Sequence, residues 1–321
     1  MDSLSRKELE NIIESSLRLD RSKGTLDQDA RPFVIGSLLR GIPAGELEIL
    51  NLAGARFGYR HVGFSLDSVF TMSTEDIVAK AQMVSPYIDT LVTGFIDEET
   101  FGYGRSLSET LSNTIQVPLV SMMDDIYAPQ PALGLLSTIW GELGNIEGRR
   151  IAISWGYGSR FTHQNLAHSL LTLGAKLGAE MVVASPPEFS LMRRIIRNAE
   201  QLAEENNGSL VEATEFSIPS INADVVVGLN WTSLDDFSYP DKVADKAKKY
   251  KHWHFTKSLL GGRSLFITEP PIQTDLLASM DLIQSRNNLT PKALGRRIQV
   301  LVQSIRFVSQ LSAEGLRASL I

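Results

Sequence analysis

The sequence contains no cysteine, which excludes disulfide bonds, thiol nucleophiles and thiolate metal sites. It has no apolar run near the roughly 20 residues that a membrane-spanning helix needs, and its polar opening is unlike a signal peptide. Basic residues are not in excess, because the net charge is −6, which argues against a nucleic-acid-binding face. We therefore expect a cytoplasmic protein that acts on a small molecule and contacts neither nucleic acid nor membrane.

The remaining composition is that of an ordinary globular protein, with 43% hydrophobic and 21% charged residues. A chain of 321 residues is long enough for about two domains. A helix is expected to open near Thr74, whose hydroxyl suits an N-terminal cap. Helical segments alternate with strand-like runs at 61–64, 90–93, 117–120, 151–154, 180–184, 225–227 and 264–267. This alternation predicts an α/β fold with two doubly wound parallel sheets covered by helices.

The glycines between Gly141 and Gly148 mark the predicted boundary between the two sheets. A ligand is expected in the cleft where the carboxyl ends of the strands of both halves face each other. We predict a first domain, a second domain and a terminal helix that packs back toward the first domain, over residues 1–143, 144–290 and 291–321.

One turn resembles a dinucleotide-binding loop. Trp155-Gly-Tyr-Gly158 follows a predicted strand and precedes a helix, but Phe161 replaces the third glycine and no acidic residue ends the next strand. The pattern favours a βα turn without a nucleotide cofactor. A helix N-terminus at this place can still receive an anion or a carboxylate.

Other catalytic patterns are missing. His163 and His168 are five residues apart and have no carboxylate at metal-binding spacing, which argues against a zinc site. No GxSxG elbow supports a serine hydrolase, and Asp235 and Asp236 are typical of solvated acids in a loop. We expect neither a metal nor a cofactor.

Several segments nevertheless resemble the aspartate/ornithine carbamoyltransferase family in order and spacing. They are Val117–Ile139, Arg150–Trp155, Asn165–Ser169 and residues 178–186. Asn230-Trp231 and residues 251–256 are closer to the knotted branch, which includes acetylornithine transcarbamylases. The resemblance implies a carbamoyl-phosphate-type first domain, an amino-acid-binding second domain, a homotrimer with sites at subunit interfaces, and a trefoil knot near residues 160–270.

The segments that bind the donor in this family are altered. Its S-T-R-T-R phosphate loop falls on Pro43-Ala-Gly45-Glu46-Leu47, and its HCLP motif falls on Thr268-Glu269-Pro-Pro271. The histidine of its HPxQ motif falls on Ala128, and Gln130 lies one residue from the position of the glutamine. Phosphate recognition depends on guanidinium forks, hydroxyl donors and a helix N-terminus, and a carboxylate in the first turn would repel it. Ordinary carbamoyl-phosphate chemistry is therefore not expected.

The acceptor segments match the family better. The resemblance implies that a small amino acid or amine contacts five residues, which are Asn165, His168, Ser169, Asn230 and Trp231. Two of them have a structural alternative, because Asn165 suits a helix cap and Trp231 suits a core aromatic position. On the donor side the candidates are Gly45, in the altered loop, and the possible replacement anchors Arg40, Arg105 and Gln130.

Three functions remain open at this point. In the first, the chemistry has changed, and Glu269 and Glu46 suit a cationic or hydrogen-bond-donating group of the substrate, with Glu269 as the acid/base. In the second, the chain is a catalytically inactive binding or regulatory subunit. In the third, Arg40, Arg105 and Gln130 rebuild the anion site of a true carbamoyltransferase.

Overall fold

A computed structural model describes residues 4–19, 33–64, 73–216, 222–314 and 319–320. The chain forms two compact units. The first consists of Met1–Ser137 with Gly295–Ile321, and the second is Thr138–Leu294. The domain limits inferred from the sequence stay predictions, as does the trefoil knot.

The first unit is built on a five-stranded sheet in which all described strand pairs are parallel. The strand order is β10-β4-β3-β1-β2, so the direction of winding reverses between β1 and β3. The strands are β1 (Val34–Arg40), β2 (Arg60–Gly63), β3 (Thr90–Phe95), β4 (Leu119–Asp124) and β10 (Ser319–Leu320).

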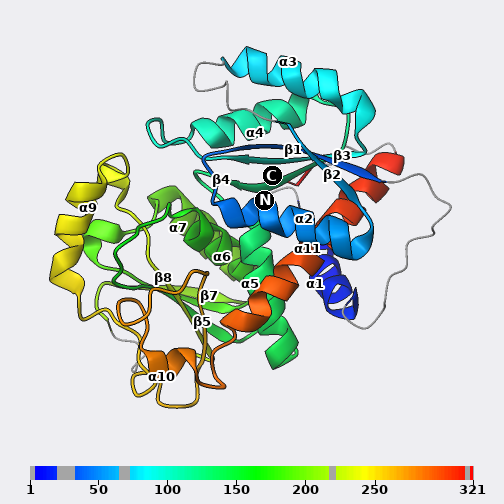
Figure 1. Cartoon of the computed structure of the whole chain (residues 1–321). Coiled ribbons are helices and arrows are strands. Elements are labelled where there is room, and N and C mark those ends of the chain that lie inside the picture. The colour runs from blue at the N-terminus through cyan, green and yellow to red at the C-terminus, as the bar shows by residue number, and fades with distance from the viewer. Residues whose placement is uncertain (1–3, 20–32, 65–72, 217–221, 315–318, 321) are drawn as a thin grey trace. The chain divides into compact units, whose positions relative to one another are not determined.

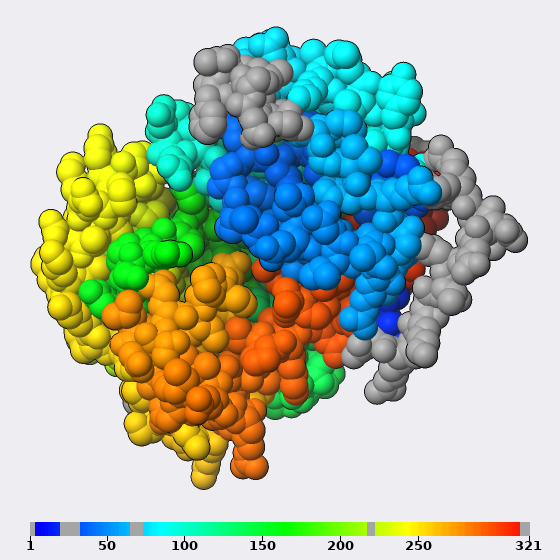
Figure 2. All heavy atoms as spheres, viewed as in Figure 1, coloured from blue at the N-terminus to red at the C-terminus, as the bar shows by residue number. Residues whose placement is uncertain are grey.

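Helices cover both faces of this sheet. Figure 1 shows α3 and α4 on one face and α2 on the other, and Figure 2 shows α2, in blue, at the surface. Leu38, Ile77, Leu107 and Leu111 belong to the buried cluster between the sheet and the α3/α4 layer. The helices are α1 (Arg6–Leu19), α2 (Ala44–Phe57), α3 (Thr74–Val84) and α4 (Tyr103–Thr114), with parts of α5 (Pro129–Leu143) and α11 (Thr290–Ala313).

The ends of these helices follow local capping rules. Helix α2 stops at Gly58, whose φ of 75° is favourable for glycine and whose N–H donates to Gly54 O. Helix α3 has a capping box in which the Ser73 hydroxyl and the Asp76 side chain each accept a backbone N–H of the other. The prediction that Thr74 caps this helix was therefore wrong by one residue.

The second unit has the same type of sheet. All its described strand pairs are parallel, and the order β7-β6-β5-β8-β9 reverses between β5 and β8. The strands are β5 (Arg150–Trp155), β6 (Glu180–Ala184), β7 (Ser209–Ala213), β8 (Val225–Leu229) and β9 (Leu265–Ile267).

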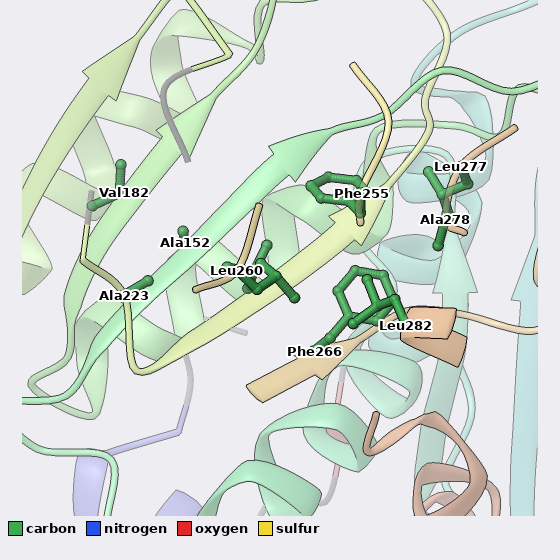
Figure 3. Close-up of a cluster of buried hydrophobic side chains, with 10 residues drawn as sticks. Ala152, Val182, Ala223, Phe255, Leu260, Phe266, Leu277, Ala278 and Leu282 are labelled. Atoms are coloured by element: carbon green, nitrogen blue, oxygen red, sulfur yellow. The ribbon is translucent and has the colours of Figure 1, made fainter. Parts of the chain in front are cut away.

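Helices α6 (Asn165–Lys176) and α7 (Arg193–Glu205) pack side by side in this unit. The unit also contains α9 (Pro240–Ala247) and α10 (Met280–Ile283). Phe255, Phe266, Leu277 and Leu282 lie in a buried cluster against β5 and β8 (Figure 3). The predicted fold class is thus confirmed, although strands β1, β7 and β10 were missed.

No described helix is both long and apolar enough to span a bilayer.

Candidate functional site

In open parallel α/β sheets, ligands bind beyond the carboxyl ends of the strands at the point where the strand order reverses. This rule selects one place in each unit. We call the region beyond β1 and β3 the first switch point, and the region beyond β5 and β8 the second switch point. Most of the candidate residues lie near one of these two places.

Arg40 ends β1 at the first switch point. Its Nη2 donates to Asp97 Oδ2 at 2.8 Å, just beyond β3, and the two side chains are 23% and 14% exposed. Asp97 Oδ1 also accepts the N–H groups of Glu99 and Thr100 at 3.0 and 2.7 Å. The Arg40 guanidinium lies over the ring of Tyr103, 5.9 Å from its centroid. The charge of Arg40 is therefore already neutralised within the unit.

Arg105, in the first turn of α4, is also paired. Its Nε donates to Glu109 Oε1 at 2.7 Å, and its Nη1 lies 3.6 Å from Asp124 Oδ2. The guanidinium lies over the ring of Tyr127 at 5.2 Å from the centroid. Two carboxylates and an aromatic face thus hold this second candidate anchor.

Two consecutive acids follow β4. Asp125 is fully buried, and its carboxylate accepts the N–H groups of Gly102, Gly104 and Arg105 at 2.7, 3.1 and 3.0 Å. This places an internal carboxylate where the α4 N-terminus would receive an external anion. Burial raises the pKa of Asp124 to about 6, although the nearby Arg105 charge opposes this shift.

Glu46 forms a buried ion pair with Arg297 of α11. Its side chain is 3% exposed and that of Arg297 is 11% exposed. A Cβ on Gly134 of α5 would lie 2.4 Å from Arg297 Cγ, so the α5 backbone packs directly against this arginine. The positive charge that Glu46 contacts therefore belongs to Arg297 and not to a substrate. Gly45, by contrast, has open space around it.

Gln130 is buried in the first unit, where its Oε1 accepts the Ser304 hydroxyl at 3.2 Å. Its Nε2 is buried and makes no hydrogen bond within the described part of the chain. Ala128, at the position of the family's histidine, is 1% exposed. Gln130, in the first turn of α5, is thus held against α11.

In the second unit, the α6 candidates lie in the interior. His168 and Ser169 are fully buried, and Asn165 is 5% exposed. His168 Nε2 accepts the N–H of Met192 at 3.3 Å. Asn165 Oδ1 accepts the N–H of Leu166 at 2.8 Å, which is a local contact at the start of the helix.

Trp231 is 1% exposed, and its indole N–H and its carbonyl are both hydrogen-bonded. Its Nε1 donates to Phe189 O at 2.7 Å, and its carbonyl accepts Trp155 Nε1 at 3.0 Å. Trp155 also packs against Phe189, with ring centroids 4.6 Å apart. Trp231 therefore occupies the position of a core aromatic.

Asn230 and Gln273 close the second switch point. Asn230 Nδ2 donates to Arg160 O at 2.5 Å, and Gln273 Nε2 donates to the same oxygen at 3.1 Å. Gln273 Oε1 accepts the Ser159 N–H at 2.6 Å, the Ser159 hydroxyl at 3.1 Å and the Arg160 N–H at 3.3 Å. These contacts are between neutral groups.

Glu269 lies two residues after β9 and is partly exposed. The preceding Thr268 is buried, and its N–H donates to Thr290 Oγ1 at 3.1 Å. Glu269 belongs to the second unit and Glu46 to the first. Neither unit by itself therefore contains both predicted catalytic carboxylates.

A cavity of about 400 Å³ lies away from all these residues. It is lined by residues that precede β3 and β4, including Ser85, Pro86 and Val117, and so lies at the amino ends of these strands. Within the described ranges, no group of three or more histidines and acids is placed to hold a metal ion.

Residues 150–289 match the family model "Aspartate/ornithine carbamoyltransferase, Asp/Orn binding domain". The chain is similar to the ornithine carbamoyltransferase of Hyperthermus butylicus, with 27% identity over 68% of this chain and 66% of that protein. It is also similar to that of Pyrococcus abyssi, with 29% identity over 58% of this chain and 54% of that protein. Residues 150–289 thus match the Asp/Orn binding domain of this family, and both relatives support the same family. The matched part spans between about half and two thirds of these two relatives.

Solved structures of carbamoyltransferases share the fold. Acetylornithine transcarbamylase complexed with acetylcitrulline has a TM-score of 0.82 and 19% identity, over 93% of this chain and 95% of that one. A variant of N-acetyl-L-ornithine transcarbamylase complexed with carbamyl phosphate and N-succinyl-L-norvaline has a TM-score of 0.81 and 20% identity, over 94% and 96%.

Sequence reasoning missed several residues that pair with the candidate residues or lie beside them. Asp124 and Asp125 could have been noticed, because two acids directly follow an apolar strand. Asp97, Gln273 and Arg297 carry no local signal. Their partners are 57, 114 and 251 residues away, so only the folded chain identifies them.

Proposed function

We propose that this family member binds a small amino acid or amine through its second unit and does not transfer the carbamoyl group of carbamoyl phosphate. The observation that carries this proposal is the internal pairing of three arginines of the first unit. Arg40 pairs with Asp97, Arg105 with Glu109 and Asp124, and Arg297 with Glu46.

A phosphate dianion would have to compete with these carboxylates. Charge-assisted hydrogen bonds are roughly twice as strong as neutral ones, and a bond to a charged group contributes about 1.5–3 kcal/mol. Freeing Arg40 would break such a bond to Asp97, and freeing Arg105 would break its bond to Glu109 and leave Asp124 facing the phosphate. The α4 N-terminus is occupied by Asp125 in the same way. The first unit therefore offers little for a donor dianion.

The second unit supports ligand binding for the opposite reason. The contacts of Asn230 and Gln273 at its switch point are neutral, and Gln273 is only partly buried. A ligand that replaces them has no ion pair to break. We propose Glu269 as the acid/base of any reaction there, and we assign Glu46 a structural role because of its buried pair with Arg297.

The same pairing of the first unit favours a second candidate function. A family member that has lost its donor site could persist as a binding or regulatory subunit, without chemistry of its own. Both candidates predict binding of an amino acid or amine, and only the first predicts turnover that depends on Glu269.

The test is a thermal-shift titration of the whole protein, with the Pyrococcus abyssi ornithine carbamoyltransferase as a positive control. The panel contains carbamoyl phosphate, inorganic phosphate, ornithine, N-acetylornithine, arginine and agmatine. A ligand at one hundred times its dissociation constant stabilises the native state by about 2.7 kcal/mol, which raises the melting temperature measurably.

We expect a shift with at least one amino acid or amine and none with carbamoyl phosphate or phosphate. A shift with carbamoyl phosphate, or formation of citrulline from ornithine and carbamoyl phosphate, would overturn the proposal. Once a reaction is found, a Glu269→Gln variant with full activity would remove Glu269 from the mechanism.

A further inference from the structure

The turn after β5 gathers hydrogen-bond donors around one point. The Ser159 N–H, the Ser159 hydroxyl and the Arg160 N–H all donate to the single Oε1 of Gln273, at 2.6, 3.1 and 3.3 Å. A cluster of backbone N–H groups in a turn forms an anion-binding concavity. We call these three donors the Ser159–Arg160 seat.

The conformation of the Ser159–Arg160 seat is fixed by close packing of the turn that carries it. A Cβ on Gly158 would lie 2.0 Å from Asn230 Nδ2, so the turn requires glycine for the close approach of this amide. A Cβ on Gly156 would lie 2.4 Å from Leu277 Cδ1, so the start of the turn packs directly on the core. Leu277 belongs to the buried cluster in Figure 3.

Gln273 is anchored at its backbone and is only partly buried. Gln273 O accepts the N–H of Leu277 at 2.8 Å, which ties residue 273 to the core. The part of the chain that contains this segment, in orange, lies at the surface in Figure 2. The side chain of Gln273 can therefore rotate away without unfolding the segment that carries it.

A neutral amide oxygen is a weak occupant for such a site. Hydrogen bonds to an ionised acceptor are roughly twice as strong as those to a neutral one. The side chain of Arg160 is exposed, and among the described residues it makes no ion pair, so a positive charge stands on the same turn. A carboxylate would gain from all four groups.

We infer that the Ser159–Arg160 seat binds the carboxylate of the ligand, and that Gln273 holds the seat until the ligand displaces it. This inference rests on the proposed function and narrows its substrate class: the ligand is an amino acid or another carboxylate, and a plain amine is excluded.

The first experiment needs no ligand. Gln273→Glu places a carboxylate in the seat, and Gln284→Glu adds the same charge at an exposed position of the same unit. At pH 7 we expect Gln273→Glu to raise the melting temperature by roughly 2–4 °C over wild type, and at pH 3 we expect no gain because the new carboxyl is protonated. Gln284→Glu should change little at either pH. A Gln273→Glu protein that folds by circular dichroism but is not stabilised at pH 7 overturns the seat.

The second experiment compares ligands that differ by one carboxylate, in binding titrations of arginine against agmatine and ornithine against putrescine. We expect the amino acids to bind at least tenfold tighter, Gln273→Ala to tighten their binding, and Gln273→Glu to abolish it. Equal binding of arginine and agmatine would overturn the seat and leave the proposed function standing. If none of the four binds, the proposed function fails, and the melting comparison still decides the seat.

Discussion

The two units have the same kind of sheet but are closed at their switch points by different chemistry. In the first unit the closing contact is an ion pair between Arg40 and Asp97. In the second unit it consists of neutral amide hydrogen bonds from Asn230 and Gln273 to the Ser159–Arg160 turn. Two similar sheets can therefore carry charged contacts at one switch point and neutral contacts at the other.

The sequence match has the same asymmetry. The residues that match the family's Asp/Orn binding domain, 150–289, all lie in the second unit. Two of the altered motifs, at 43–47 and 128, lie in the first unit together with the three paired arginines, and the third, at 268–271, lies in the second unit. This distribution is expected if the first unit lost donor binding and its arginines were then paired with carboxylates of the same unit. The predictions below test that comparison.

The largest effect is expected at the buried pair of the first unit. Glu46→Gln leaves the charge of Arg297 buried without its partner, and breaking such a pair costs about 3–5 kcal/mol. All four tryptophans, at positions 140, 155, 231 and 253, lie in the second unit. Urea unfolding should therefore be followed both by far-ultraviolet circular dichroism and by tryptophan fluorescence.

We expect the dichroism transition to move to much lower urea in Glu46→Gln. Glu48→Gln, an exposed site on the same helix, is the control and should change stability by less than about 0.5 kcal/mol. A Glu46→Gln protein of normal stability would contradict the structural role and restore Glu46 as a catalytic candidate.

The next effect is a pH dependence located in the first unit. Asp124 has a folded pKa of about 6, above its ordinary value of 3.8, so between these values the folded state binds more protons than the unfolded state. The stability that this group contributes is therefore fully present below about pH 4 and is lost as the pH rises through 6. The loss amounts to about 1–3 kcal/mol.

Asp124→Asn removes this titration but keeps an oxygen that can accept the N–H groups of Ile126 and Tyr127. We expect the stability difference between variant and wild type to shift in favour of the variant between pH 4 and pH 7. The measurement is urea unfolding of both proteins at both pH values. A difference that is the same at both would show that Asp124 does not titrate in this range.

Much of the fold was predictable because it depends on local pattern. Buried strands such as β5, β6 and β8 are continuous apolar runs, and their helices begin and end near the expected residues. Strand β7 was missed because it lies at a sheet edge and its residues are mostly half-buried or exposed. Burial alone does not decide what local pattern finds, because the exposed edge strand β2 was predicted and the buried central strand β1 was missed.

The candidate residues were found by motif position, but their partners were not. Motif matching selected Arg40, Glu46 and Arg105, and it left open whether their charges were available to a ligand. The answer depends on Asp97, Asp124 and Arg297, which reach these residues only through the tertiary fold. A charged residue found by motif position can be taken as a ligand-binding group only when the residues that contact it in the folded chain are known.

A smaller effect is expected for Trp231 in the second unit. Trp231→Phe keeps an aromatic ring but removes the N–H that donates to Phe189 O, and an unsatisfied buried carbonyl costs about 1–3 kcal/mol. We expect tryptophan fluorescence to report a lower unfolding midpoint while amino-acid affinity changes little. Loss of binding at unchanged stability would make Trp231 a ligand contact, as the family resemblance implies.

The smallest effect is expected when the ion pair at the first switch point is removed, because the contacts there then become neutral, like those at the second switch point. Asp97→Asn removes the carboxylate that neutralises Arg40 but keeps an oxygen for the N–H groups of Glu99 and Thr100. The freed guanidinium, 23% exposed, could then pair with an external anion. We expect inorganic phosphate to bind this variant about tenfold tighter than wild type, which corresponds to about 1.4 kcal/mol, by isothermal titration. Glu99→Gln removes the same charge from an exposed neighbour, and its affinity for phosphate should rise much less. If both variants gain the same affinity for phosphate, the gain comes from the change in net charge. The ion pair of Arg40 with Asp97 is then not what prevents phosphate binding in the first unit.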